Sequence, residues 1–218
     1  MRREPEAGVV LSMELLEQVC SRLCHDMAGP IGAIRNGVEL ISEAEGTRGD
    51  DHALDLIGHS AEQGARRLRL FRLAYGRAGR DASSFADVRE TARDWLDGGR
   101  TTLHWPAGHP EDKLAARPGL GRLLLNLVVL AVETIPLGGV VTVAGNGTVT
   151  TGSATVTVTG RTVNWLPDMA TALTDWQTRE ASSRAVHAAI TGRFAAHYCM
   201  IVTWEQSDSE SLSLRLSW

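Results

Sequence analysis

Residues 24–37 read C-H-D-M-A-G-P-I-G-A-I-R-N-G and lie inside the longest helical pattern of the chain. Apolar residues in and around this segment recur every three or four positions: Leu16, Val19, Leu23, Met27, Ile31, Ile34, Val38 and Ile41. Such spacing is typical of one apolar face along an α-helix. Ser12 is a suitable N-cap and Gly46 a suitable stop. The segment also holds one proline and three glycines, which disfavour a helix interior and need an explanation.

A second helical pattern follows after a short loop. Its apolar positions also share one face: Leu54, Ile57, Ala61, Ala65, Leu68, Phe71 and Tyr75. Two helices joined in this way form an antiparallel hairpin. Because a lone hairpin buries both apolar faces poorly, we expect a homodimer in which two hairpins make a four-helix bundle. This helical part is predicted to occupy residues 1–80.

The pattern changes over residues 81–218, where helices and strands are interspersed. Helices are predicted over residues 84–97, 118–135 and 182–198, and strands over residues 101–105, 140–159, 200–205 and 212–218. Pro118 would stand in the first turn of its helix, and Asn146-Gly147 would form a hairpin turn. This order predicts an α+β sandwich, with helices on one face of a largely antiparallel sheet.

Composition and charge limit the cellular location and the classes of partner that we expect for this protein. The chain has 218 residues, a net charge of −4 and 43% hydrophobic residues, so nothing in its overall charge suggests a nucleic-acid partner. The N-terminus carries acidic residues and a proline where a signal peptide needs an apolar run. The longest apolar run is too short to cross a membrane. Three cysteines make no disulfide framework. We therefore expect a cytoplasmic protein with no membrane or nucleic-acid partner.

His25 is predicted to face away from the apolar side of the first helix. At about 100° per residue it lies roughly 180° from Leu16 and Ile34, which disfavours a buried core position. The other histidines are interpreted as ordinary surface residues: His52, His59, His104, His109, His187 and His197. A metal site with Cys20 and Cys24 would need more ligands than this helix supplies.

Four residues share the predicted face of His25: Arg22, Gly29, Gly32 and Asn36. Glycine leaves the backbone bare, so a partner protein can come close to the imidazole. Pro30 offers no N–H to the carbonyl of Asp26 and should kink the helix just after His25. The alternative is that the bundle merely tolerates these glycines. We favour a docking surface for a partner that reaches His25.

The side chains of this face suit phosphoryl transfer. A neutral imidazole is a good nucleophile near pH 7, since histidine has an ordinary pKa of about 6.5. The carboxylate of Asp26 can accept a hydrogen bond from the other ring N–H and take up the released proton.

The segment H-D-M-A-G-P resembles the H-box of sensor histidine kinases. The wider segment S-R-L-C-H-D-M-A-G-P-I-G-A-I-R-N-G-V-E-L resembles the ChpT-type histidine phosphotransferases of alphaproteobacterial phosphorelays. That resemblance implies a dimeric helical hairpin followed by a degenerate histidine-kinase ATPase-like domain. It implies His25 as phosphoacceptor with Asp26 as its neighbouring acid. The donor would be the receiver domain of a hybrid histidine kinase, and the acceptors response regulators such as CtrA and CpdR.

The second part resembles a kinase ATP-binding domain that has lost its nucleotide site. In L-L-L-N-L-V-V-L-A-V-E-T-I-P-L-G-G, Asn126 matches the first asparagine of the kinase N-box, but Leu130 replaces the Mg²⁺-binding asparagine. An aliphatic side chain cannot coordinate Mg²⁺. The Asp-x-Gly-x-Gly box is missing, and R-E-A-S-S-R-A-V-H replaces the glycine-rich lid. We expect no cofactor or metal in this chain, with Mg²⁺ bound only by the partner receiver.

Three alternatives stay open. An active ATP-dependent kinase conflicts with the missing nucleotide elements. A non-catalytic regulatory module that only binds response regulators would also expose a histidine. A nucleic-acid-binding role would rest on the basic residues 66–80, but these residues keep the apolar positions of the bundle, so the arginines are interpreted as its solvated flank.

Overall fold

The computed structural model describes residues 9, 11–43, 47–77, 85–106, 117–175 and 181–218. The predicted stop at Gly46, the residues after Arg77 in the basic segment, and His109 lie outside these residues. No helix among the described residues has the length and apolar character needed to span a membrane.

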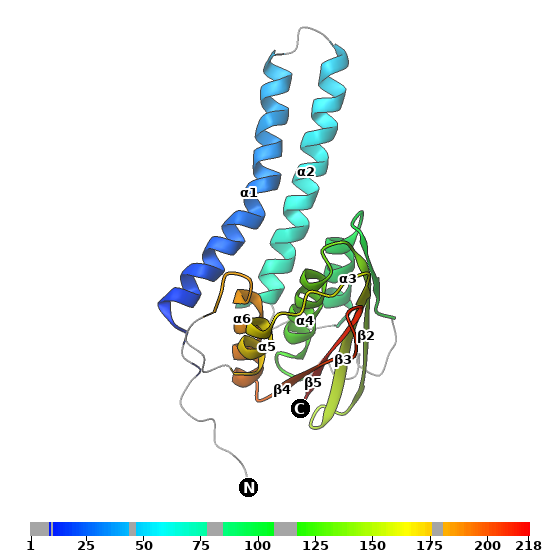
Figure 1. Ribbon diagram of the computed structural model, residues 1–218. Helices are drawn as coiled ribbons and strands as arrows, with labels where there is room; N and C mark the ends of the chain where they lie inside the picture. The colour runs from blue at the N-terminus through cyan, green and yellow to red at the C-terminus, as the bar shows by residue number, and fades with distance from the viewer. Residues whose placement is uncertain (1–8, 10, 44–46, 78–84, 107–116, 176–180) are drawn as a thin grey trace.

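Helices α1 (Met13–Glu43) and α2 (Thr47–Ala74) form the predicted antiparallel hairpin, which extends away from the rest of the molecule (Figure 1). Ser12 caps α1, because its hydroxyl accepts a hydrogen bond from the N–H of Leu15 at 3.2 Å. Gly37 is required where the two helices meet. A Cβ there would lie 2.5 Å from the side chain of Ile57 and 3.2 Å from the carbonyl of Ala53.

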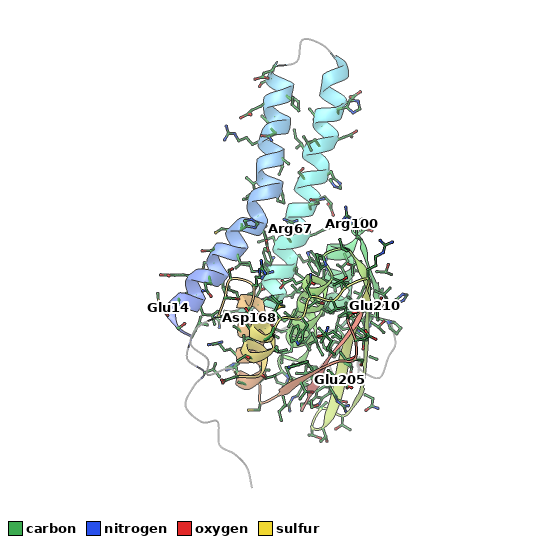
Figure 2. The ribbon with its side chains drawn as sticks, viewed as in Figure 1. Glu14, Arg67, Arg100, Asp168, Glu205 and Glu210 are labelled. Carbon is green, nitrogen blue, oxygen red and sulfur yellow. The ribbon has the colours of Figure 1, made fainter. Side chains whose placement is uncertain are left out.

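Helix α1 bends near the middle of its length (Figure 1), and Pro30 lies inside it. Pro30 leaves the carbonyl of Asp26 without its helical donor. The guanidinium of Arg67 on α2 donates to that carbonyl instead. Figure 2 shows Arg67 between the two helices, beside the bend. The second helix therefore compensates for the hydrogen bond that the proline removes.

The second part is built on a five-stranded sheet in the order β1-β2-β3-β5-β4. The strands are β1 (Thr101–His104), β2 (Gly139–Gly147), β3 (Gly152–Gly160), β4 (Ile201–Gln206) and β5 (Ser211–Ser217). Strands β1 and β2 are parallel, and the other pairs are antiparallel. The sheet is therefore largely antiparallel, as predicted.

Four helices lie on one side of this sheet (Figure 1): α3 (Phe85–Leu96), α4 (Leu120–Thr134), α5 (Pro167–Thr174) and α6 (Val186–His197). Alternate strand residues such as Val156 and Val158 are fully buried beneath them. Helix α4 is buried along most of its length and forms the centre of the core. The α+β class is confirmed.

Two local predictions were wrong, and one short helix was not predicted. Asn146 and Gly147 are not the hairpin turn, because they pair with Ser153 and Gly152, and the turn lies at residues 148–151. Pro118 precedes helix α4, since Gly119 takes a left-handed conformation (φ 78°) that stops the helix from starting earlier. Helix α5 was missed, although Pro167 in its first turn is a helix-start signal.

Candidate functional site

His25 projects from α1 into solvent, with 89% of its side chain exposed. The Oδ1 atom of Asp26 lies 3.5 Å from His25 Nδ1, at the outer limit of a hydrogen bond. When Nδ1 carries the proton and donates to this carboxylate, Nε2 has the free lone pair. The exposed nitrogen of the ring is then the nucleophile.

The glycines on the face of His25 differ from Gly37 in the hairpin interface. A Cβ added at Gly29 or Gly32 would meet no atom of the described residues within 4 Å. Packing within this part of the chain therefore gives no reason for these two glycines. Asn36 is also exposed on this helix. These observations fit a surface that a partner protein approaches closely.

Arg22 departs from the expected arrangement, because it is not freely presented on the docking face. Its side chain is 28% exposed and forms an ion pair with Glu133 on α4. Its Nε atom lies 4.0 Å from Oδ2 of Asp26. Arg22 thus connects the helix that carries His25 to the core helix of the second part.

A surface hollow of about 710 Å³ lies beside His25, between α1 and the segment that begins α6. Its lining residues are Glu17, Gln18, Ser21, Arg22, His25, Asp26, Ser183 and Val186. Sequence reasoning missed Ser183 and Val186, which belong to the segment that replaces the kinase lid. The only signal was that replacement, which gave no indication of where the segment lies.

His187 was wrongly interpreted as a surface histidine, because its side chain is fully buried on α6. Its Nε2–H donates to the carbonyl of Asn126 at 2.8 Å, and the hydroxyl of Tyr75 donates to Nδ1 at 2.5 Å. Burial, reinforced by the positive charge of Arg22, lowers the pKa of His187 to about 3. Burial also raises the pKa of Tyr75 well above its ordinary range. These neutral groups join the end of α2 to the core.

Glu133 is the acidic member of the same region. Burial raises the pKa of its carboxyl to about 7, although the nearby Arg22 guanidinium acts in the opposite direction. Asp26 adds to the rise through like-charge repulsion. The Arg22–Glu133 pair and the Tyr75–His187 pair both lie at the junction between the hairpin and the second part.

The basic part of α2 is used within the chain. Arg66 pairs with Asp97, and Arg69 pairs with Glu90 and Asp94 of α3. The interpretation of these arginines as a merely solvated flank is therefore incomplete, because they attach α2 to α3. Within the described residues, no cluster of three or more His, Cys, Asp or Glu side chains could hold a metal ion.

A model of the histidine phosphotransferase C-terminal domain matches residues 85–210, which is more than half of the chain. The chain therefore belongs to the histidine phosphotransferase family. Among curated proteins, it is 32% identical to protein phosphotransferase ChpT of Brucella abortus (strain 2308) over 155 residues, which are 69% of each chain.

Solved structures include a bacterial phosphotransferase determined at 1.7 Å that matches with a TM-score of 0.74 and 28% identity. The match covers 95% of this chain and 98% of that one. The histidine kinase AdeS of Acinetobacter baumannii gives a TM-score of 0.47 and 12% identity over 88% of this chain and 96% of that one.

Proposed function

We propose that this chain relays a phosphoryl group through His25, from the receiver aspartate of a hybrid histidine kinase to the aspartates of CtrA- or CpdR-like response regulators. The observation that supports this proposal most strongly is the geometry of His25, whose side chain is 89% exposed and has Asp26 beside Nδ1. The bare surface at Gly29 and Gly32 and the adjacent hollow give a receiver domain room to dock. Membership of the phosphotransferase family supports the same chemistry.

In the transfer, the bond that forms and the bond that breaks both lie within this protein and its receiver partner. Nε2 of His25 attacks the phosphorus of the aspartyl phosphate, the bond between phosphorus and the aspartate oxygen breaks, and a phosphorus–nitrogen bond forms. The carboxylate of Asp26 takes the Nδ1 proton as the ring gains its substituent. The reverse steps deliver the phosphoryl group to the second receiver. Mg²⁺ belongs to the receivers, where it neutralises the transferring group.

A homodimer is part of this proposal. Among the large apolar side chains of the hairpin that are more than half exposed, four fall into two pairs, each pair on one face of its helix: Ile31 at 58% and Val38 at 54%, and Leu54 at 56% and Leu68 at 52%. Two of them come from each helix, at positions that the contact between α1 and α2 leaves uncovered. A second hairpin would cover them and complete a four-helix bundle.

We further propose that the chain takes its phosphoryl group from a receiver and not from ATP. Leu130 is fully buried in the core. The amide of Asn126 is also buried, and its Nδ2 donates to the carbonyls of Ala74 at 3.0 Å and Arg122 at 2.9 Å. At the two positions that match the kinase N-box asparagines, Leu130 thus packs in the core and Asn126 links α4 to the end of α2.

The test combines this protein with a phosphorylated receiver and a second, unphosphorylated regulator. We expect the wild type and His52→Ala, a change at an exposed histidine of α2, to pass label to the regulator. His25→Ala should pass none. Transfer by His25→Ala would refute the assignment. Stable unlabelled binding by the wild type would support the non-catalytic module, and labelling by ATP alone would support a kinase.

A further inference from the structure

Asp26 lies between two possible hydrogen-bond donors. Its Oδ1 faces Nδ1 of His25 at 3.5 Å, and its Oδ2 faces Nε of Arg22 at 4.0 Å. Both distances are long, so neither donor holds the carboxylate firmly. The guanidinium is permanently charged and forms stronger bonds with carboxylates than a neutral imidazole does. Left to itself, Arg22 would therefore draw Asp26 away from His25.

Glu133 changes the outcome of this competition. Its Oε1 accepts a hydrogen bond from Nη2 of Arg22, whereas the nearest oxygen of Asp26 stays 4.0 Å from Nε of the same guanidinium. The side chains are 28% exposed for Arg22 and 21% for Glu133, so water screens their attraction only in part. Glu133 comes from α4, so the second part of the chain supplies the group that engages Arg22.

We propose that Glu133 is a positioning residue for His25: by engaging Arg22, it leaves Asp26 free to accept the Nδ1 proton and keeps Nε2 as the nucleophile. This inference rests on the proposed role of His25 as phosphoacceptor. Glu133 acts through Arg22 and Asp26 and touches no phosphoryl group.

The first experiment records the imidazole ¹⁵N spectrum of His25 in the full chain, in the wild type and in Glu133→Gln, at a pH well above the pKa of about 7 of Glu133. The isosteric amide keeps the shape and loses the charge. We expect the share of the Nδ1–H tautomer to fall in the variant as Arg22 moves toward Asp26. The rate of phosphoryl transfer to His25 should fall about fivefold, which corresponds to one lost hydrogen bond.

The variant Arg22→Gln distinguishes a positioning role of Glu133 from a purely structural role of the Arg22–Glu133 ion pair. If the ion pair only braces α1 against α4, removing either partner should have the same effect on the tautomer. If Glu133 restrains a competing cation, Arg22→Gln should leave the Nδ1–H tautomer in place. The double variant Arg22→Gln/Glu133→Gln should then recover the tautomer that Glu133→Gln loses.

The matched control is Glu90→Gln. Glu90 also reaches from the second part to an arginine of the hairpin, since it pairs with Arg69 on α2 at 3.5 Å. The Glu90→Gln variant should leave both the His25 tautomer and the rate of phosphoryl transfer unchanged.

Two results would overturn the inference: an unaltered tautomer in a folded Glu133→Gln chain, or equal losses in Arg22→Gln and Glu133→Gln. If Glu133→Gln fails to fold, Arg22→Gln and the double variant still test the proposal. Loss of the Nδ1–H tautomer in Arg22→Gln would contradict it. The tautomer is measured without any receiver. A tautomer that shifts as expected in a chain that accepts no phosphoryl group would therefore refute the proposed function, while the control of the His25 tautomer by Glu133 would still hold.

Discussion

The residue that shapes the site is Pro30. It removes the helical donor for the carbonyl of Asp26, and Arg67 of α2 replaces that donor. The backbone of the residue next to His25 is thus held by a side chain from the other helix. A kink without a replacement donor would leave the Asp26 carbonyl unsatisfied. The hydrogen bond from Arg67 therefore stabilises the bend in α1.

We predict that Arg67→Ala lowers the free energy of unfolding by about 1–3 kcal/mol, because it leaves the Asp26 carbonyl without a protein donor. In a Pro30→Ala background, where residue 30 supplies its own N–H, the same change should cost clearly less. Urea unfolding of the four chains of this cycle measures both values. Arg72→Ala, at an exposed arginine of α2, is the control. Equal costs of Arg67→Ala in the two backgrounds would show that the carbonyl does not depend on Arg67.

His187 makes stability depend on pH. Its pKa is about 3 in the folded chain and about 6.5 when unfolded. Between these values the unfolded chain binds more protons, so stability falls as pH falls. Arg22 on α1 and Tyr75, which follows α2, face this imidazole, and no carboxylate among the described residues acts to raise its pKa. Glu133 has the opposite effect between its ordinary pKa and about 7, because its folded pKa is raised.

The stability difference between wild type and His187→Gln isolates the histidine, since both chains keep Glu133. We expect the advantage of the wild type to be about 2 kcal/mol smaller at pH 5 than at pH 7. Urea unfolding at the two pH values measures it. An advantage that does not change with pH would mean that His187 is not held neutral in the folded state.

At the scale of elements, α1 divides its apolar residues between two sides. Met27 and Ile34 are half-buried, whereas Ile31 and Val38 are exposed. Periodicity predicted a single apolar face, because spacing alone cannot tell which neighbour covers each residue. The long helices and the closing strands were predictable from repeated apolar positions. Helix α5 has only eight residues, too few for the pattern to stand out.

The exposed side of α1 predicts how the dimer responds to charge. Val38→Asp should convert a dimer into a monomer, because it places a carboxylate in the expected contact between hairpins. Leu40→Asp is the matched control, since Leu40 is 53% exposed against 54% for Val38 and lies about 200° away around the helix. Light scattering after gel filtration measures the mass. A Val38→Asp dimer, or a wild-type monomer, would contradict the predicted bundle.

At the scale of the whole molecule, the hairpin and the second part meet through polar contacts that sequence reasoning could not find. Arg22 pairs with Glu133, Tyr75 bonds to His187, and the amide of Asn126 reaches the end of α2. These partners lie 52 to 112 positions apart in the chain. Local patterns predicted His25, Asp26 and the bare glycines of one helix. The side chains that approach from α4 and α6 depend on the tertiary fold.

The central claim is that Nε2 of His25 carries the phosphoryl group. The most direct measurement locates that group in the intact protein after reaction with a phosphorylated receiver, with an alkaline quench, ³¹P NMR and fragment mass spectrometry. We expect an acid-labile, alkali-stable phosphoryl group on Nε2 of His25. A phosphoryl group found on any other residue, or no label on a chain that still passes phosphate to a regulator, would contradict it.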